Sequence, residues 1–167
     1  MTWKNHRLTT FTIAFALTGS LPATAIATAS AVLPDALELN GILGHRTVTH
    51  YPWFYLAPTA ILWGIQRRYP GYLLYILFFV LVGCICHLLE DLLSMKGVPL
   101  KMPYGCPTGL KFYATHQSSE TFTAWAIIFC SGLLAWHKGM LSKDFLMVEA
   151  DRTAMFVIGF SRQFVWY

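Results

Sequence analysis

The chain has 167 residues, of which 56% are hydrophobic and only 12% are charged. A soluble domain usually has about a quarter of its residues charged, so this composition is typical of a membrane protein. The net charge of +4 comes from lysines and arginines that stand singly or in pairs. Because they form no basic stripe that follows a phosphate backbone, nucleic acid is not expected as a partner. No long Ser/Gly/Pro linker divides the chain, and we expect residues 1–167 to form a single membrane-embedded domain.

The first apolar stretch, residues 8–33, is broken at its centre by Gly19-Ser20-Leu21-Pro22. Proline removes a backbone donor and breaks a helix, which leaves two alternatives. The stretch is either one kinked span or a helical hairpin, or re-entrant element, that brings His6 back to the side of Asp35. The segment also has the order of a secretory signal peptide, but further apolar stretches follow it, and we expect it to be retained.

Three more apolar stretches follow, separated by turn-forming residues. They cover approximately residues 51–66, 72–93 and 122–136. A helix needs about 20 apolar residues to cross the hydrocarbon core. The predicted fold class is therefore all-α: a polytopic helical membrane protein with an N-terminal hairpin or re-entrant element and about three spanning helices. Residues 34–50 and 94–121 are expected as loops at a membrane face, and residues 138–167 as a polar, interfacial tail. Lysines and arginines divide evenly between the two faces, so the positive-inside rule favours neither orientation.

The polar residues gather at one end of these spans. The stretches 51–66 and 72–93 form an antiparallel pair, so the start of the first and the end of the second lie on the same side of the membrane. Ionisable groups near or within the bilayer are costly and normally mark a functional site. The residues expected to meet at this face are His45, His50, His87, Asp91 and Glu120. If the first apolar stretch is a hairpin, His6 and Asp35 join them.

The residue types in this cluster are those that bind metals. His87 and Asp91 are four residues apart, so a helix presents both on one face. His45 and His50 flank Arg46, and neutral imidazoles bind zinc or manganese. For Asp35, a ligand role is favoured over a helix cap. We therefore predict a helix-end site for a divalent ion, zinc first and manganese second, with the ligands His6, Asp35, His45, His50, His87 and Asp91.

Three residues, Glu38, Arg46 and Glu120, receive catalytic roles in addition to the ligand Asp35. A bound metal lowers the pKa of water toward about 7, and a nearby carboxylate takes the proton. Glu38, Glu120 and the ligand Asp35 are the candidate bases, although Glu38 can equally be a helix cap or a support behind the ligands. Arg46 would hold the anionic group of a substrate in a bidentate fork and stabilise charge in the transition state.

The order of these motifs resembles a known family. An N-terminal His6 precedes the apolar hairpin, and three motifs follow: Leu33-Pro34-Asp35, then His45-Arg46-Thr47-Val48-Thr49-His50, then His87-Leu88-Leu89-Glu90-Asp91-Leu92-Leu93 with Gly97-Val98-Pro99 after it. Over residues 1–125 the chain resembles the YdjM-type bacterial inner-membrane proteins, described as LexA-regulated, membrane-bound metal-dependent hydrolases. The resemblance implies a multi-pass protein of the bacterial inner membrane with a His/Asp metal centre, remotely similar to zinc-dependent phospholipase C. The chain departs from the family at Leu37, where a second Asp is usual, and keeps only part of a Gly-Ser-x-x-Glu-like segment in Ser118-Ser119-Glu120.

Two functions from different classes follow. The first is a membrane-bound metal-dependent hydrolase that acts on a lipid phosphoester or another membrane-associated substrate. The second is a noncatalytic membrane assembly or conjugation component with a structural metal site. An open coordination position favours the hydrolase, and a fully occupied tetrahedron favours the structural role. The expected partners are membrane lipid and, for the second function, a membrane protein. A transporter is disfavoured because no polar residue lies at mid-membrane.

Overall fold

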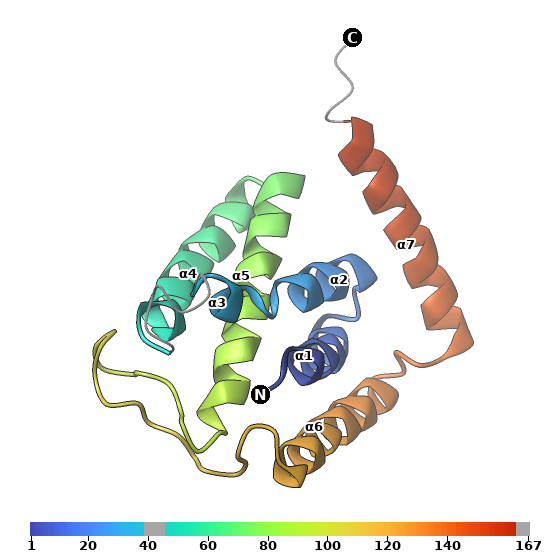
Figure 1. Cartoon of the computed structure of the whole chain (residues 1–167). Helices are drawn as coiled ribbons and strands as arrows, with labels where there is room; N and C mark the ends of the chain where they lie inside the picture. The colour runs from blue at the N-terminus through green and yellow to red at the C-terminus, as the bar shows by residue number, and fades with distance from the viewer. Residues whose placement is uncertain (39–45, 163–167) are drawn as a thin grey trace.

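The computed structural model describes residues 1–38 and 46–162, and its regular elements are helices (Figure 1). This confirms the all-α class. In chain order the elements are α1 (Trp3–Thr18), α2 (Leu21–Ser30), α3 (Leu33–Ala36), the 3-10 helix η2 (Val48–His50), α4 (Trp53–Arg68), α5 (Tyr72–Leu92), α6 (Ser118–His137) and α7 (Lys143–Arg162).

The first apolar stretch forms the hairpin alternative. Helix α1 ends at Gly19, whose φ of 64° lies in the left-handed region that favours glycine. Ser20 then caps α2 by accepting the N–H of Ala23, and Pro22 occupies the first turn, where a helix does not need the missing donor. Because α2 returns along α1, its end reaches the start of α1.

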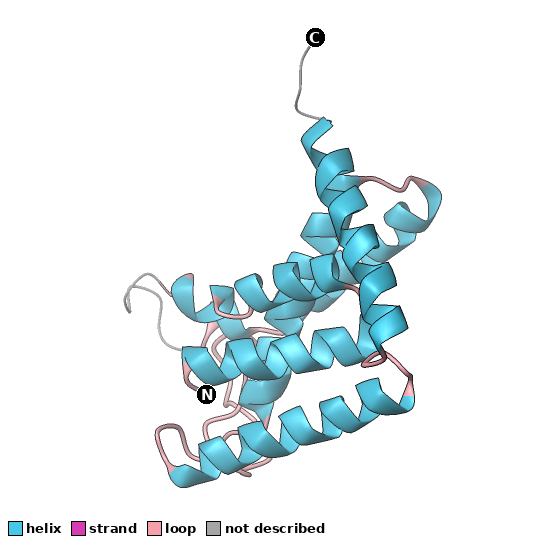
Figure 2. Cartoon of the chain, turned by 90° about the vertical axis from the view of Figure 1, so that its right-hand side faces the viewer, coloured by secondary structure: helices cyan, strands magenta, loops and turns pink. Residues whose placement is uncertain are grey.

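Helix α5 lies at the centre of the arrangement and contacts α1, α2 and α4 (Figure 1). Helix α6 lies along α1 (Figure 2). Where an interfacial tail was expected, the chain forms α7, which contacts α2. The buried carboxylate of Glu149 in α7 accepts the N–H of Leu21 at 2.9 Å and so joins the two helices.

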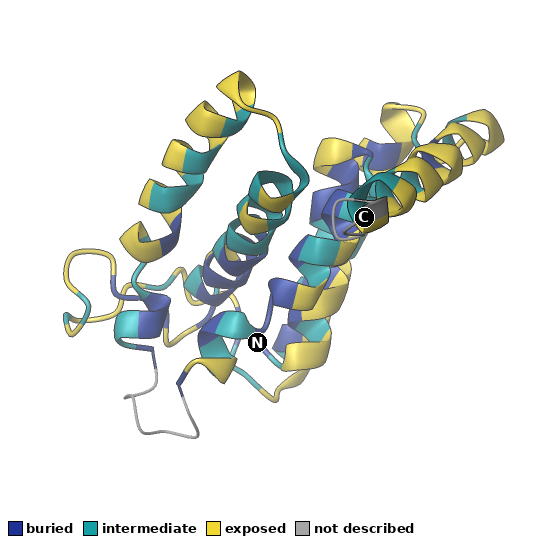
Figure 3. Ribbon diagram, turned by 90° about the horizontal axis from the view of Figure 1, so that it is seen from above, coloured by how far each residue is buried: buried dark blue, intermediate teal, exposed yellow. Residues whose placement is uncertain are grey.

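The inner and outer faces of the helices have unusual compositions. Buried residues concentrate on the inward faces (Figure 3) and include threonines, histidines and carboxylates, whereas large apolar side chains such as Phe122, Trp125 and Leu73 remain exposed on the outside. An exposed apolar exterior of this extent marks a surface that contacts lipid or protein.

Among the residues that the structure describes, α5 is the one helix that is long and apolar enough to cross a membrane, by length and composition. The prediction of about three spanning helices is therefore not confirmed. Helix α4 has 16 residues, fewer than the roughly 20 that a span needs. Helix α6 has 20 residues, but its first turns carry serine, threonine and glutamate, which lower its apolar character.

The close contact between α2 and α5 requires Gly83. A Cβ atom at this position would lie 2.2 Å from the carbonyl oxygen of Ala27 and from Oγ of Ser30. We predict that Gly83→Ala forces the helices apart and lowers the free energy of unfolding by about 1–3 kcal/mol. Thermal unfolding in detergent measures this loss. Gly64→Ala is the matched control because nothing lies within 4 Å of its Cβ position, and it should be neutral or stabilising by about 0.5–1 kcal/mol. Equal shifts for the two variants would contradict the packing argument.

Candidate metal centre

Four side chains from three elements meet at the end of α5. Asp35 comes from α3, His50 from η2, and His87 and Asp91 from the last turns of α5. One ligand atom from each lies within 4.8 Å of the corresponding atoms of the other three. His50, His87 and Asp91 are buried, and Asp35 is partly exposed. We call these four residues the ligand group.

The separations within the ligand group match those around a single ion. Nε2 of His50 lies 3.2 Å from Nε2 of His87, and these atoms lie 3.3 and 3.5 Å from Oδ1 of Asp35. Oδ2 of Asp91 lies 3.5 and 3.7 Å from the same two nitrogens. Donors at the corners of a tetrahedron with metal bonds of about 2.0–2.1 Å are about 3.3 Å apart. The geometry therefore fits a divalent ion held by two imidazoles and two carboxylates.

The other nitrogen of each imidazole has an acceptor beside it. Nδ1 of His87 lies 2.7 Å from the carbonyl oxygen of Ala31, and Nδ1 of His50 lies 3.1 Å from Oε1 of Glu38. When Nδ1–H donates to such an acceptor, Nε2 carries a lone pair and can bind metal. Two lone pairs that face each other at 3.2 Å repel, and a shared cation relieves this repulsion.

His6 adjoins the ligand group. Its ring stacks on His87 with 3.8 Å between centroids, and its Nδ1 lies 2.5 Å from Oε2 of Glu90. Its Nε2 is buried without a hydrogen-bond partner, 3.5 Å from Oδ1 of Asp91. Nε2 of His6 thus points toward Asp91, but it faces Oδ1, whereas Oδ2 is the oxygen of Asp91 that faces His50 and His87. The predicted ligand His6 therefore lies beside the ligand group.

The charges of the group are strongly coupled. Burial alone would raise the pKa of Asp35, but hydrogen bonds from His50 and His87 hold it well below its usual range. Burial lowers the pKa of His50, but the carboxylates of Asp35 and Asp91 outweigh it, so this pKa lies above 6.5. The ionised carboxylates therefore favour a positive charge among them, which a proton on His50 or a metal ion supplies.

Arg46 contacts protein groups on several sides. Its Nη2 lies 2.7 Å from Oδ2 of Asp91, and its Nη1 donates to Oγ of Ser94 at 2.7 Å and to the carbonyl of Gly97 at 3.1 Å. Its backbone N–H donates to Glu38 at 2.8 Å. These contacts indicate that Arg46 helps to position Asp91, and its predicted contact with a substrate anion stays a prediction.

The two predicted glutamates bind N–H donors. Oε1 of Glu38 accepts from Arg46 and faces Nδ1 of His50, so this carboxylate supports a ligand from behind. Glu120 accepts the N–H groups of Thr2 and His116 and the side chain of Asn5, at 2.6–2.7 Å. It ties the start of α1 to α6 and lies outside the ligand group. The remaining predicted ligand, His45, lies outside the described residues.

Sequence reasoning missed two supporting residues. Glu90 holds His6 and also accepts the hydroxyl of Thr10 at 3.1 Å, and Trp3 donates its indole N–H to Oδ2 of Asp35 at 3.0 Å. Glu90 had a signal, because a carboxylate in the last turn of an apolar helix is costly and needs a partner. Trp3 had none beyond its place near the N-terminus.

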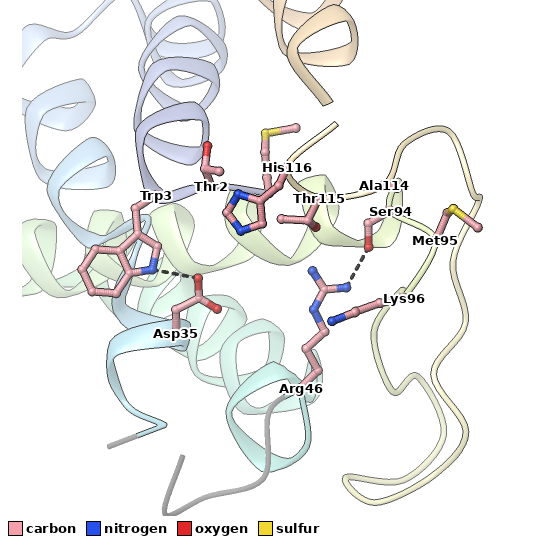
Figure 4. A pocket seen from close by; sticks show the side chains of 11 residues that line it. Thr2, Trp3, Asp35, Arg46, Ser94, Met95, Lys96, Ala114, Thr115 and His116 are labelled. Atoms are coloured by element: carbon pink, nitrogen blue, oxygen red, sulfur yellow. Dashed lines mark hydrogen bonds between the residues drawn. The ribbon is translucent and has the colours of Figure 1, made fainter. Parts of the chain in front are cut away.

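A cavity of about 670 Å³ opens beside the ligand group (Figure 4). Asp35 and Arg46 form part of its wall, and Lys96 and His116 add basic side chains from the segment between α5 and α6. The cavity joins the one partly exposed ligand, Asp35, to the surface. It therefore provides room for a substrate next to the ligand group.

We predict that Arg46→Met lowers the free energy of unfolding by about 1.5–3 kcal/mol, because it removes one of the two cationic groups that pair with the buried carboxylate of Asp91, the other being the N-terminal ammonium of Met1 at 2.8 Å. Arg46→Lys should recover only part of this loss, since an ammonium cannot reach Asp91, Ser94 and Gly97 together. Thermal unfolding in detergent measures both. Arg68→Met, at an exposed site, is the control and should stay within about 0.5 kcal/mol. If Arg46→Met is as stable as this control, Arg46 does not position Asp91.

Comparison with curated proteins and with solved structures finds no match. The family model described as YdjM inner membrane protein matches residues 1–160. This range includes the hairpin, all four residues of the ligand group and nearly all of α7, and it extends beyond the resemblance noted over residues 1–125. The match to almost the whole chain shows that the protein belongs to the YdjM inner membrane protein family.

Proposed function

We propose that this protein is a membrane-bound metal-dependent hydrolase that cleaves a phosphoester of a membrane lipid. The observation that carries the proposal is the ligand group, in which four donors have the separations of a metal tetrahedron and one of them, Asp35, reaches a cavity of about 670 Å³. A site built in this way can hold an ion and admit a substrate beside it.

The donor types favour catalysis. Structural zinc sites are usually built from cysteines, alone or with histidine, whereas catalytic sites use histidine and carboxylate ligands. The ligand group contains no cysteine. Its carboxylates suit zinc and also manganese, which accepts additional oxygen ligands.

The chain's own residues divide the work of hydrolysis. When bound, a divalent ion supplies Lewis acidity and lowers the pKa of water toward about 7. Asp35 is the carboxylate that reaches the cavity, where its Oδ1 would hold the ion and Trp3 fixes its Oδ2. Lys96 and Arg46 in the cavity wall favour an anionic group of the substrate there. Glu38 and Ala31 keep the two imidazoles oriented.

A second function has one observation in its favour. Four protein donors fill a tetrahedron, and a filled tetrahedron is typical of a structural site. In this case the metal ties α3, η2 and α5 together, and the protein is a noncatalytic membrane assembly or conjugation component with a membrane-protein partner. The partial exposure of Asp35 to the cavity leads us to prefer the hydrolase.

The first test concerns the metal. We predict that the purified chain binds about one zinc or manganese ion and that His87→Ala removes it, because one of four donors is lost. His137→Ala is the matched control, since His137 is exposed at the end of α6, and it should keep the metal. Elemental analysis of detergent-purified protein measures the content. Unchanged metal content in His87→Ala would refute the ligand assignment.

The second test concerns catalysis. We predict a hydrolytic activity on vesicles of phospholipid or lipid phosphate that chelator abolishes and added zinc or manganese restores. Asp35→Asn should reduce turnover by about 100-fold or more, because it removes a charged donor of the ion beside the cavity. Lipid phosphate release and membrane-peptide cleavage are measured side by side. If chelation instead lowers only thermal stability or partner binding, and no substrate is cleaved, the structural function is correct.

A further inference from the structure

The segment between α5 and α6 has an unusual surface. We call residues 95–112 the basic loop. Its side chains Met102, Tyr104 and Phe112 have 66, 78 and 66% of their area exposed. Lysines stand at positions 96, 101 and 111, and the sequence has no acidic residue between Asp91 and Glu120. The basic loop therefore combines large exposed apolar groups with positive charge.

The base of this loop is firmly built. The N–H groups of Leu110 and Phe112 donate to the carbonyls of Leu92 and Leu93, both at 2.8 Å. Val98 and Thr108 exchange backbone hydrogen bonds at 2.8 and 2.9 Å. Gly97 packs so closely that a Cβ atom there would lie 2.1 Å from a backbone oxygen. The apolar side chains are thus presented by an ordered base that is attached to the end of α5.

The position of the loop points to a bilayer. Helix α5 is the candidate span. When such a helix crosses the hydrocarbon core, a loop that begins where it ends lies at the boundary between hydrocarbon and head groups. Aromatic and apolar side chains mixed with lysines favour that boundary, and the negative charge of anionic lipids attracts the lysines. A protein partner of the same chemistry would need to supply acidic groups, whereas the membrane that holds α5 is already adjacent.

Lys96 connects the loop with the ligand group. It lines the cavity beside Asp35 and also a second cavity of about 570 Å³, whose wall includes Tyr104 and Pro107. Figure 4 shows Lys96 beside Arg46 on the side of the cavity where the segment lies. A lipid head group held by the loop would therefore lie next to the cavity at the ligand group.

We propose that the basic loop docks on the anionic surface of the membrane that holds α5, so that the cavity opens onto lipid head groups. Docking of this kind makes anionic phospholipid the substrate class of the proposed hydrolase. Only this substrate assignment rests on the proposed function. Docking itself needs no catalysis.

The chain carries its own reporter. Cys106 in the loop is exposed, Cys84 and Cys86 are buried, and Cys130 is the other exposed thiol. In a Cys130→Ser background, Cys106 is labelled with an environment-sensitive fluorophore. The full-length chain is placed, one copy per disc, in nanodiscs of phosphatidylcholine with or without phosphatidylglycerol. With the anionic lipid we expect a blue shift, strong quenching by nitroxide lipids and weak quenching by iodide in water.

The charge dependence separates docking from simple proximity. Removing three lysines from the loop should reduce its partition onto the anionic surface by about tenfold or more. A control set removes equal charge at exposed positions elsewhere and should behave as the parent. The loop set is Lys96→Gln, Lys101→Gln and Lys111→Gln, and the control set is Lys4→Gln, Lys143→Gln and Arg152→Gln.

Three outcomes would overturn the proposal. They are full quenching by iodide in anionic discs, equal behaviour of the two charge sets, and a blue shift that appears only with two copies per disc, which would assign the surface to a second chain. Metal content is measured on the same samples. Docking without bound metal supports the docking proposal and contradicts the metal-dependent hydrolase. Bound metal without docking contradicts the docking proposal and leaves the hydrolase proposal unaffected.

Discussion

The charge of Asp91 is the constraint on which the rest of the structure depends. This carboxylate is buried in the last turn of the most apolar helix, where an ion without partners is very costly. Arg46 meets it at 2.7 Å, and His6 and His50 each lie 3.5 Å away. Because these partners come from different parts of the chain, neutralising this one carboxylate brings α1, Arg46 and η2 together around the end of α5.

The packing of the helices and the geometry of the ligand group form a single system. Small residues let α2 approach α5 at Gly83, as is common where helices associate in membranes. The same approach brings the carbonyl of Ala31 to 2.7 Å from His87 and so orients that imidazole. The interior is correspondingly polar, and Thr9, Thr10 and Thr24 are fully buried. A change in helix spacing is therefore also a change in the orientation of a ligand.

The sequence predicted the helical class and much of the ligand group, for reasons that can be stated. A spacing of four placed His87 and Asp91 on one face, and the order of apolar stretches brought Asp35 and His50 to the same end. The role of Arg46 was not accessible, because tertiary contacts choose the partner of a long side chain. The sequence also could not predict that Glu90 contacts His6 while Asp91 belongs to the ligand group. A helix that is apolar on every side does not reveal which face meets α1. The prediction of about three spans is not confirmed, because α4 is shorter than a span needs and the first turns of α6 are polar.

The contact between the hairpin and α5 joins residues far apart in the sequence, and this separation has a consequence for biosynthesis. His6 finds its carboxylate partner 84 residues later in the chain. At a synthesis rate of 5–20 residues per second, His6 waits on the order of 4 to 17 s before Glu90 has been added to the chain. During that time the polar inner face of the hairpin must remain hydrated or be covered by the insertion machinery. The hairpin therefore reaches its final place late, only after the end of α5 has been synthesised.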